Sequence, residues 1–270
     1  MILTLTVQQI KKIKQIVQQM VDSGVHFGHR KRQRNPKMIP YIYKKKERIG
    51  AQRTKEVVEI VQQDDFQIID LLQTYWYLKK ASLFLFNLCR RGKRVLFVGT
   101  KKHVAKCIEQ TAKSCNSWYI NKRWLGGLLT NWKTMAKSVR KMQQENQFIS
   151  KSKKEKARIE RQRKRLLKYF GGIKTMPESE LPDVVIIVGQ QKEMNAVHEC
   201  KKLEIPSLTI LDTNCDPSLT DFVIPANDDS VTSVNYILTR LSKAIQEGQK
   251  DYQKQKKKNK YKKIEKYNHS

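Results

Sequence analysis

Short apolar segments alternate with longer stretches of helical periodicity along most of the chain, and this alternation restricts the fold more than any other feature. Two segments, residues 183–188 and 207–211, are almost continuously apolar, as strands buried on both faces of a sheet are. Further strands are predicted at residues 66–71, 94–99, 118–120 and 222–224, and helices at 74–90, 102–114, 195–203 and 230–246. The pattern predicts an α/β protein with a parallel sheet and crossover helices.

Residues 131–169 depart from this alternation. The segment has no Pro or Gly, is rich in Lys, Arg, Gln and Glu, and carries only sparse apolar residues. It is too polar for a core, and we interpret it as two long helices folded back as a hairpin that turns near residues 147–152. A disordered insert is the alternative that the composition leaves open.

The charge of the chain is large and unevenly distributed. The 270 residues include 55 Lys and Arg against 25 Asp and Glu, for a net charge of +30. Three runs are basic: fourteen bases against two acids in residues 11–55, thirteen against three in 137–168, and nine against two in 248–270. Residues 180–230 hold ten acids and three Lys. One charged run is commonly only a solvated face, but three runs around an acidic core indicate arms that bind nucleic-acid phosphates.

Nothing in the sequence indicates a membrane or secreted protein. The continuous apolar runs at residues 95–99 and 184–189 have five and six residues, far short of the roughly 20 that cross a bilayer. The N-terminal segment lacks the apolar core and cleavage site of a signal peptide, so we expect the protein to work where it is made. The five cysteines lie far apart without a C-x-x-C pair, which predicts reduced thiols in a non-secretory compartment.

Two segments lie where α/β proteins bind ligands, but neither carries the residues of an enzyme. Residues 99–102 follow a predicted strand but lack the first glycine of a P-loop, so we expect Lys101 and Lys102 to contact RNA phosphate. Asp212 and Asp216 follow another strand, where carboxylates suit acid–base chemistry or Mg²⁺. Because no nucleophile–base pair accompanies them, we interpret both as turn residues. The sequence predicts no catalytic residue, metal site or cofactor.

His26 and His29 are three residues apart, a spacing that would place them on one face of a helix. Zinc would need two further ligands, and the nearest candidates are distant in sequence, so we interpret these histidines as RNA contacts. Phe27 lies between them, and a run with three arginines follows. An aromatic ring interleaved with cations is typical of RNA-binding surfaces.

Arg123 and Trp124 offer a cation and a stacking surface next to each other. Gly126 and Gly127 follow them and permit a tight backbone path. The alternative is that Trp124 and Trp132 pack at the base of the helical hairpin.

Several strings in this sequence occur together, and in this order, in one protein family. They are G-V-H-F-G-H at residues 24–29, N-P-K-M at 35–38, F-V-G-T-K at 97–101, N-K-R-W-L-G-G at 121–127, G-G-I-K at 171–174, L-P-D at 181–183, D-T-N-C-D-P at 212–217 and I-P-A-N-D-D at 224–229. The sequence resembles small-subunit ribosomal protein S2 of the bacterial and plastid type, and looks closest to plastid members. The resemblance covers most of residues 20–246.

The resemblance implies a flavodoxin-like or Rossmann-like doubly wound sheet with a protruding coiled-coil hairpin, and a structural role without catalysis. It implies small-subunit rRNA and neighbouring ribosomal proteins as partners, with ribosomal protein S1 among them, and neither a membrane nor a small-molecule substrate. The plastid likeness implies the chloroplast stroma, with the mitochondrial matrix or the bacterial cytoplasm as alternatives. A nucleotide-dependent enzyme using Asp212 and Asp216, and a free-standing RNA chaperone, are the alternative functions.

These observations divide the chain into five segments. They are a basic arm with a helix and an inserted charged loop at 1–65, a first α/β part at 66–130, the helical hairpin at 131–170, a second α/β part at 171–247 and a disordered Lys-rich tail at 248–270. The inserted loop at 44–65 is longer than the family usually has. The candidate RNA-binding residues are His26, His29, Arg30, Arg32, Arg34, Lys37, Lys101, Lys102, Arg123 and Trp124.

Overall fold

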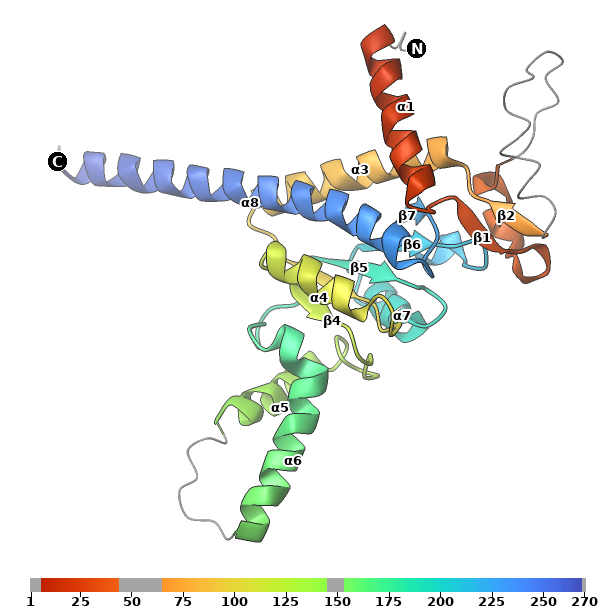
Figure 1. The fold of residues 1–270 in the computed structure, drawn as a ribbon. Coiled ribbons are helices and arrows are strands. Elements are labelled where there is room, and N and C mark those ends of the chain that lie inside the picture. Colours follow the sequence, from red (N-terminus) through yellow and green to blue (C-terminus); the bar gives the residue numbers. More distant parts are fainter. Residues whose placement is uncertain (1–5, 44–64, 145–152, 269–270) are drawn as a thin grey trace, which may run out of the picture.

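A computed structural model describes residues 6–43, 65–144 and 153–268 (Figure 1). The inserted loop expected at 44–65 therefore lies, except for Asp65, outside the described residues, as does the expected hairpin turn at 147–152. No described helix combines the length and the apolar character that a membrane span requires.

The centre of the molecule is a five-stranded sheet in which all strands are parallel. Its strands are β3 (Val95–Val98), β4 (Trp118–Ile120), β5 (Val184–Val188), β6 (Ser207–Leu211) and β7 (Phe222–Pro225). They lie in the order β4-β3-β5-β6-β7. In chain order this is 2-1-3-4-5, the flavodoxin-like arrangement. The predicted parallel α/β sheet is confirmed.

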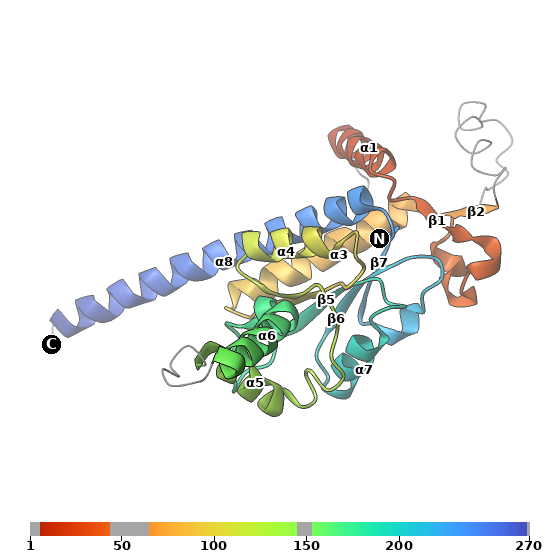
Figure 2. The same cartoon turned by 60° about the horizontal axis from the view of Figure 1, so that its bottom comes forward.

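Helices cover both faces of the sheet, which explains why its strands are apolar on both sides (Figure 2). On one face lie α3 (Leu71–Arg90), α4 (Ala105–Ser114) and α8 (Val231–Asn268). On the other lie α7 (Met194–Lys202) and the bases of α5 (Trp132–Gln144) and α6 (Lys153–Phe170). Val95 and Phe97 of β3 pack into the first layer, and Leu96 and Val98 into the second. Alternation along each strand thus builds two cores.

The chain enters the body through α1 (Val7–Asp22), whose first turn is closed by a capping box between Thr6 and Gln9. A two-stranded antiparallel ribbon follows, formed by β1 (Phe27–Arg30) and β2 (Phe66–Ile68). The prediction that residues 66–71 form a strand of the parallel sheet is wrong. The apolar run divides, because the Asp70 carboxylate accepts a hydrogen bond from the backbone N–H of Leu72 and starts α3.

Two short 3-10 helices, η1 (Lys31–Gln33) and η2 (Pro36–Tyr41), follow the first strand of this ribbon. The N-terminal arm is held to the body beyond β6, where the backbone N–H of Asn35 donates to the carbonyl of Thr213 at 2.9 Å. His26 lies in the turn that follows α1 and His29 lies in β1, so the two histidines do not share a helix face.

The two helices predicted within residues 131–169 are present as α5 and α6, and α6 runs into η5 (Gly171–Ile173). They contact each other where Trp132, Ala136 and Phe170 are buried against the sheet. The alternative of a disordered insert is thus wrong for the described part. Whether the helices pack as a coiled coil stays a prediction.

The C-terminal helix differs from its prediction. Residues 248–270 were expected to be disordered because they contain almost no aliphatic residues, yet α8 continues to Asn268. The segment beyond Gly248 has no Pro or Gly, and Lys, Gln and Glu are good helix formers. Extending an existing helix avoids the cost of nucleating a new one. The first part of α8 packs along α3, which supplies that nucleus (Figure 1).

All five cysteines are free and buried. Burial raises the pKa of Cys89, Cys200 and Cys215 to about 12. The expected thiol form agrees with these surroundings.

Candidate nucleic-acid interface

The carboxyl ends of the parallel strands meet the N-terminal ribbon at one edge of the sheet. Lys101 follows β3, Asp212 follows β6, and Asp228 and Asp229 follow β7. His29 reaches this edge from β1, and the backbone N–H of His29 donates to Thr213 Oγ1 at 2.9 Å. Side chains that are far apart in sequence therefore share one site.

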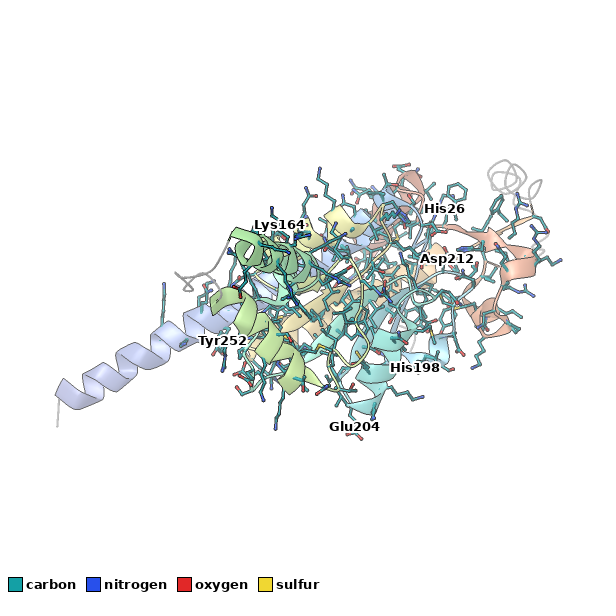
Figure 3. All side chains as sticks on the ribbon, turned by 90° about the horizontal axis from the view of Figure 1, so that it is seen from below. His26, Lys164, His198, Glu204, Asp212 and Tyr252 are labelled. Atoms are coloured by element: carbon teal, nitrogen blue, oxygen red, sulfur yellow. The ribbon has the colours of Figure 1, made fainter. Side chains whose placement is uncertain are left out.

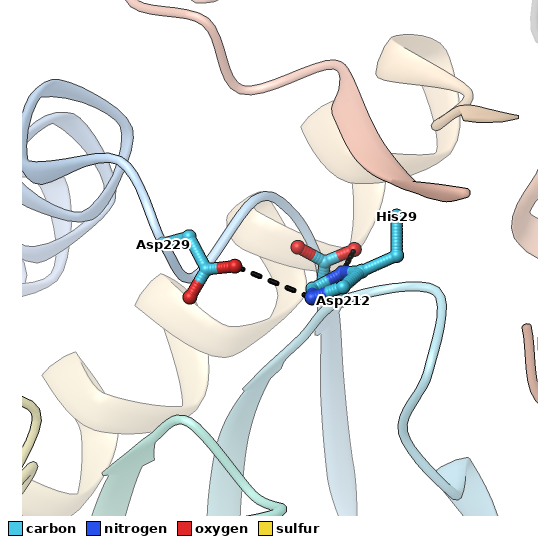
Figure 4. A group of neighbouring side chains, drawn as sticks. All are labelled: His29, Asp212 and Asp229. Atoms are coloured by element: carbon cyan, nitrogen blue, oxygen red, sulfur yellow. Dashed lines mark ion pairs between the residues drawn. The ribbon is translucent and has the colours of Figure 1, made fainter. Parts of the chain in front are cut away.

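His29 lies between two carboxylates (Figure 4). Its Nδ1 is 3.0 Å from Asp212 Oδ1, and its Nε2 is 3.2 Å from Asp229 Oδ2. The Asp212 carboxylate raises the pKa of His29 and outweighs the opposing effect of burial, and the charges of Asp229 and Asp228 add to the rise. A positively charged imidazole is thus compensated within the protein.

Lys101 is compensated in the same way. Its Nζ is 2.7 Å from Asp228 Oδ1 and 2.8 Å from Asp229 Oδ1, and its side chain is only 17% exposed. Burial works against the ammonium, but the two carboxylates raise the pKa of Lys101. Burial, together with the charge of Asp212, raises the pKa of Asp228 to about 6. Lys101 therefore joins the buried Asp228 to the exposed Asp229 and is not a free cation for phosphate.

The same cluster could hold a divalent cation. His29, Asp212 and Asp229 each bring a ligand atom within 4.8 Å of the others. Imidazole nitrogen with carboxylate oxygen is a donor set that zinc accepts. The spacing of His26 and His29 suggested these two as zinc ligands, but His26 is not part of this group. The two aspartates come from the opposite end of the chain, which spacing alone could not indicate.

Free cations lie next to this cluster, on the ribbon. Arg30 and Arg32 line an open cavity of about 720 Å³ together with Phe27 and Phe66. Both arginines are exposed, and within the described residues neither forms an ion pair. The rings of Phe27 and Phe66 are 43% and 41% exposed, and the Arg30 guanidinium lies 5.5 Å from the centroid of the Phe66 ring. Exposed rings beside unpaired guanidinium groups suit unstacked bases and their phosphates.

A second group of cations surrounds Arg123. It is exposed and lines a cavity of about 440 Å³ with Lys122 and Lys192. The Lys192 Nζ donates to the carbonyl of Thr100 at 3.0 Å, which ties this group to the end of β3. Lys122 and Lys192 line this cavity and Phe66 lines the first one, but none of the three was among the residues predicted from the sequence. Lys122 directly precedes Arg123, and that adjacency was an available signal.

The structure corrects the assignment of Trp124 as a stacking surface. Its ring is only 6% exposed, and its Nε1 donates to Glu199 Oε1 at 2.9 Å. The Glu199 carboxylate also accepts hydrogen bonds from the backbone N–H groups of Gly127, Leu129 and Thr130, at 2.8 to 3.1 Å. These bonds outweigh burial and lower the pKa of Glu199. Trp124 thus packs at the hairpin base, the alternative weighed above.

The structure also corrects the assignment of His26 as an exposed RNA contact. Its side chain is 9% exposed, and burial lowers its pKa, so the neutral ring is part of the interior. Figure 3 shows His26 and Asp212 at the same end of the molecule, far from Lys164 and Tyr252.

The other candidate RNA contacts fall into two groups. Lys37 is exposed but 2.7 Å from Asp216 Oδ2, so it joins Lys101 and His29 among the compensated cations. Lys102 is exposed and Arg34 half-buried. Arg30, Arg32, Arg34, Lys102 and Arg123 therefore remain as predicted RNA contacts.

Comparison with known proteins gives a consistent result. Residues 20–248 match the family model described as Ribosomal protein S2. The chain belongs to the ribosomal protein S2 family. Its resemblance to that family, drawn from short strings, is confirmed, and with it a structural, non-enzymatic role in the ribosome.

Three similar proteins illustrate the family relationship. Small ribosomal subunit protein uS2c of Oltmannsiellopsis viridis is 46% identical over 243 residues, which cover 88% of this chain and 94% of the relative. The protein of the same name from Chlorella vulgaris is 45% identical, covering 89% and 84%. Small ribosomal subunit protein uS2 of Nostoc punctiforme is 44% identical, covering 85% and 82%.

Proposed function

We propose that this ribosomal protein S2 chain is a constituent of the small subunit of the chloroplast ribosome, in the stroma, and that it binds small-subunit rRNA through the cavity on its N-terminal ribbon. The names of the algal relatives support the subunit and the compartment. The RNA site rests on one observation: Arg30 and Arg32, which form no ion pair within the described residues, line the same cavity as the exposed rings of Phe27 and Phe66.

The chemistry of this cavity favours a single-stranded or looped RNA segment. An A-form duplex keeps its bases stacked inside, whereas an unstacked base can lie against an aromatic ring while guanidinium groups pair with the phosphates on either side. His29 and Asp212 of the compensated cluster also line this cavity. We propose that this cluster fixes the ribbon while the arginines bind.

Neighbouring ribosomal proteins of the small subunit complete the set of partners. We propose ribosomal protein S1 among them, on the ground of the family resemblance. A pull-down of S1 with isolated small subunits, compared between subunits with and without this chain, tests that assignment.

The RNA site is tested by neutralising Arg30, Arg32 and Arg34 together to Gln. Each lost phosphate contact removes counterion release, so we expect weaker incorporation into small subunits and a smaller salt dependence of binding to small-subunit rRNA. The control replaces three exposed cations on or just after α3, Lys80, Arg90 and Arg91, by Gln, which changes the net charge equally. If both variants sediment with the subunit equally well at raised salt, the ribbon is not the RNA site.

A further inference from the structure

The end of α8 is an unusual part of this molecule because it leaves the body as a single helix. The match to the family model stops at residue 248, whereas the helix continues to Asn268. Both ribbon views show this part projecting beyond the sheet and its covering helices (Figures 1 and 2). From residue 253 to 268 the projection is about 24 Å long at the usual rise of an α-helix.

Contacts just before the projection fix its direction. A Cβ atom on Gly248 would come within 2.5 Å of the Phe86 carbonyl oxygen, so this glycine lets α8 approach α3 closely. The Gln249 side-chain amide donates to the carbonyl of Cys115 at 2.8 Å. One turn further, the ring of Tyr252 lies against Gly92, where a Cβ would be 2.7 Å from the ring. The projecting helix is therefore attached to a rigid base.

The projection is strongly basic. Residues 253–268 contain eight Lys and one acid, Glu265. The described side chains of residues 253–258, four of them Lys, are all exposed. Residues 253–260 include no apolar residue over more than two helical turns, so this stretch has neither the seam of a coiled coil nor the apolar face of a membrane-surface helix.

Like charges four residues apart weaken a helix, and Lys254 and Lys258 are such a pair. The same spacing of lysines recurs at residues 256 and 260, 258 and 262, and 262 and 266. A polyanion along the helix would remove this repulsion. Charge and geometry together thus favour a partner with regularly spaced negative groups along about 24 Å, which is the form of a nucleic-acid backbone.

We propose that residues 253–268 of α8 are a rigid arm that binds the sugar–phosphate backbone of small-subunit rRNA, at a site separate from the ribbon cavity. This inference rests on the proposed rRNA-binding function and adds a second contact outside the part shared with the family. The contact is independent of RNA sequence, because lysines pair with phosphates and not with base edges.

The test replaces Lys254, Lys256, Lys257 and Lys258 by Gln in the full chain, with the same four changed to Arg as the charge-matched control. Binding to purified small-subunit rRNA is measured over a series of salt concentrations. If all four contact phosphates, the Gln variant loses about tenfold or more in affinity at moderate salt, and its log–log salt slope falls by about 3. The Arg variant keeps the slope. An unchanged slope in the Gln variant overturns the proposal.

Two further results separate this inference from the proposed function. If the ribbon variant at Arg30, Arg32 and Arg34 loses rRNA affinity while the lysine variant does not, the proposed function stands and the arm is refuted. A photo-crosslinker placed at the exposed Gln255 in assembled subunits identifies the partner. We expect crosslinks to rRNA; crosslinks to an acidic protein alone would overturn the assignment of RNA to this arm.

Discussion

The cations at the carboxyl edge of the sheet are paired with carboxylates, whereas those on the projecting helices are mostly exposed. At the sheet edge, Lys101, His29 and Lys37 each lie within 3.2 Å of an aspartate oxygen. On α6 and the end of α8, most described lysines and arginines are exposed. Counting lysines and arginines therefore overestimates the free positive charge at the sheet edge. On the projecting helices the count is a better guide, because most of the cations there are exposed. A cation that lies near a family motif can be held by a carboxylate of the protein itself, as Lys101 and Lys37 are.

The largest expected effect concerns Glu199, a buried anion on α7. Glu199→Ala removes the acceptor of four N–H donors from the loop before α5, including Trp124 Nε1. Leaving buried donors unpaired costs about 1–3 kcal/mol each, so we expect the free energy of unfolding to fall by about 3 kcal/mol or more. Urea denaturation measures the change. Glu180→Ala, at an exposed acid, serves as the control and should have little effect.

A neighbouring pair of lysines tests the comparison most directly. Lys101→Met leaves Asp228 buried without its partner, so we expect a loss of about 3 kcal/mol in the free energy of unfolding. Lys102→Met, one residue along and exposed, should change it by less than about 0.5 kcal/mol. Urea midpoints of the two variants at pH 7 give the answer. Equal effects would mean that compensation at the edge does not stabilise the fold.

On the projecting helices, loss of cations should change RNA binding and not the stability of the fold. Arg165 and Lys168 on α6 are exposed, so replacing both by Gln should alter the free energy of unfolding by less than about 0.5 kcal/mol. If both contact phosphate, the log–log salt slope of rRNA binding falls by about 2. A stable variant with an unchanged slope would show that this face of the hairpin is only solvated.

The smallest expected effect is on the pH dependence of stability, through the Asp216 carboxylate. Burial opposes ionisation of Asp216, but hydrogen bonds from Lys37 and Ser218 lower its pKa to about 2. A carboxyl whose pKa is lowered by folding stabilises the fold above its unfolded pKa, and this contribution disappears as the pH falls through its folded pKa. Asp216→Asn should therefore lose less stability than the wild type between pH 4 and pH 2. Thermal unfolding across this range measures the difference, and parallel curves for the two proteins would contradict it.

Much of the fold was predictable because apolar period and run length report burial directly. The continuous runs at 184–188 and 207–211 are strands β5 and β6 of the sheet. The same signal misled at residues 66–71, because an apolar run does not say which strand it pairs with. The tail misled for another reason: its composition excludes a core but not the extension of a helix that begins elsewhere.

The site was less predictable because its decisive contacts join distant residues. Nothing local to His29 indicates Asp212, or local to Lys101 indicates Asp228. Trp124 gives a second example. The local sequence, a tryptophan beside an arginine, is the same whether the ring faces RNA or donates to a buried carboxylate such as Glu199. Arg30 and Arg32 stay predicted RNA contacts, and their exposure agrees with a polar run that offers no local acid to pair with.

The five buried thiols give the folded protein a further property. The thiolate is the reactive form of cysteine, and burial keeps the sulfur atoms of Cys89, Cys200 and Cys215 protonated far above neutral pH. Alkylating reagents and peroxides therefore reach these sulfurs only when the surrounding layers open. Cys200 belongs to the core below the hairpin and Cys89 to the core between α3 and α8. The rate at which each sulfur is labelled would time the opening of each face of the sheet separately, with the native cysteines and no substitution.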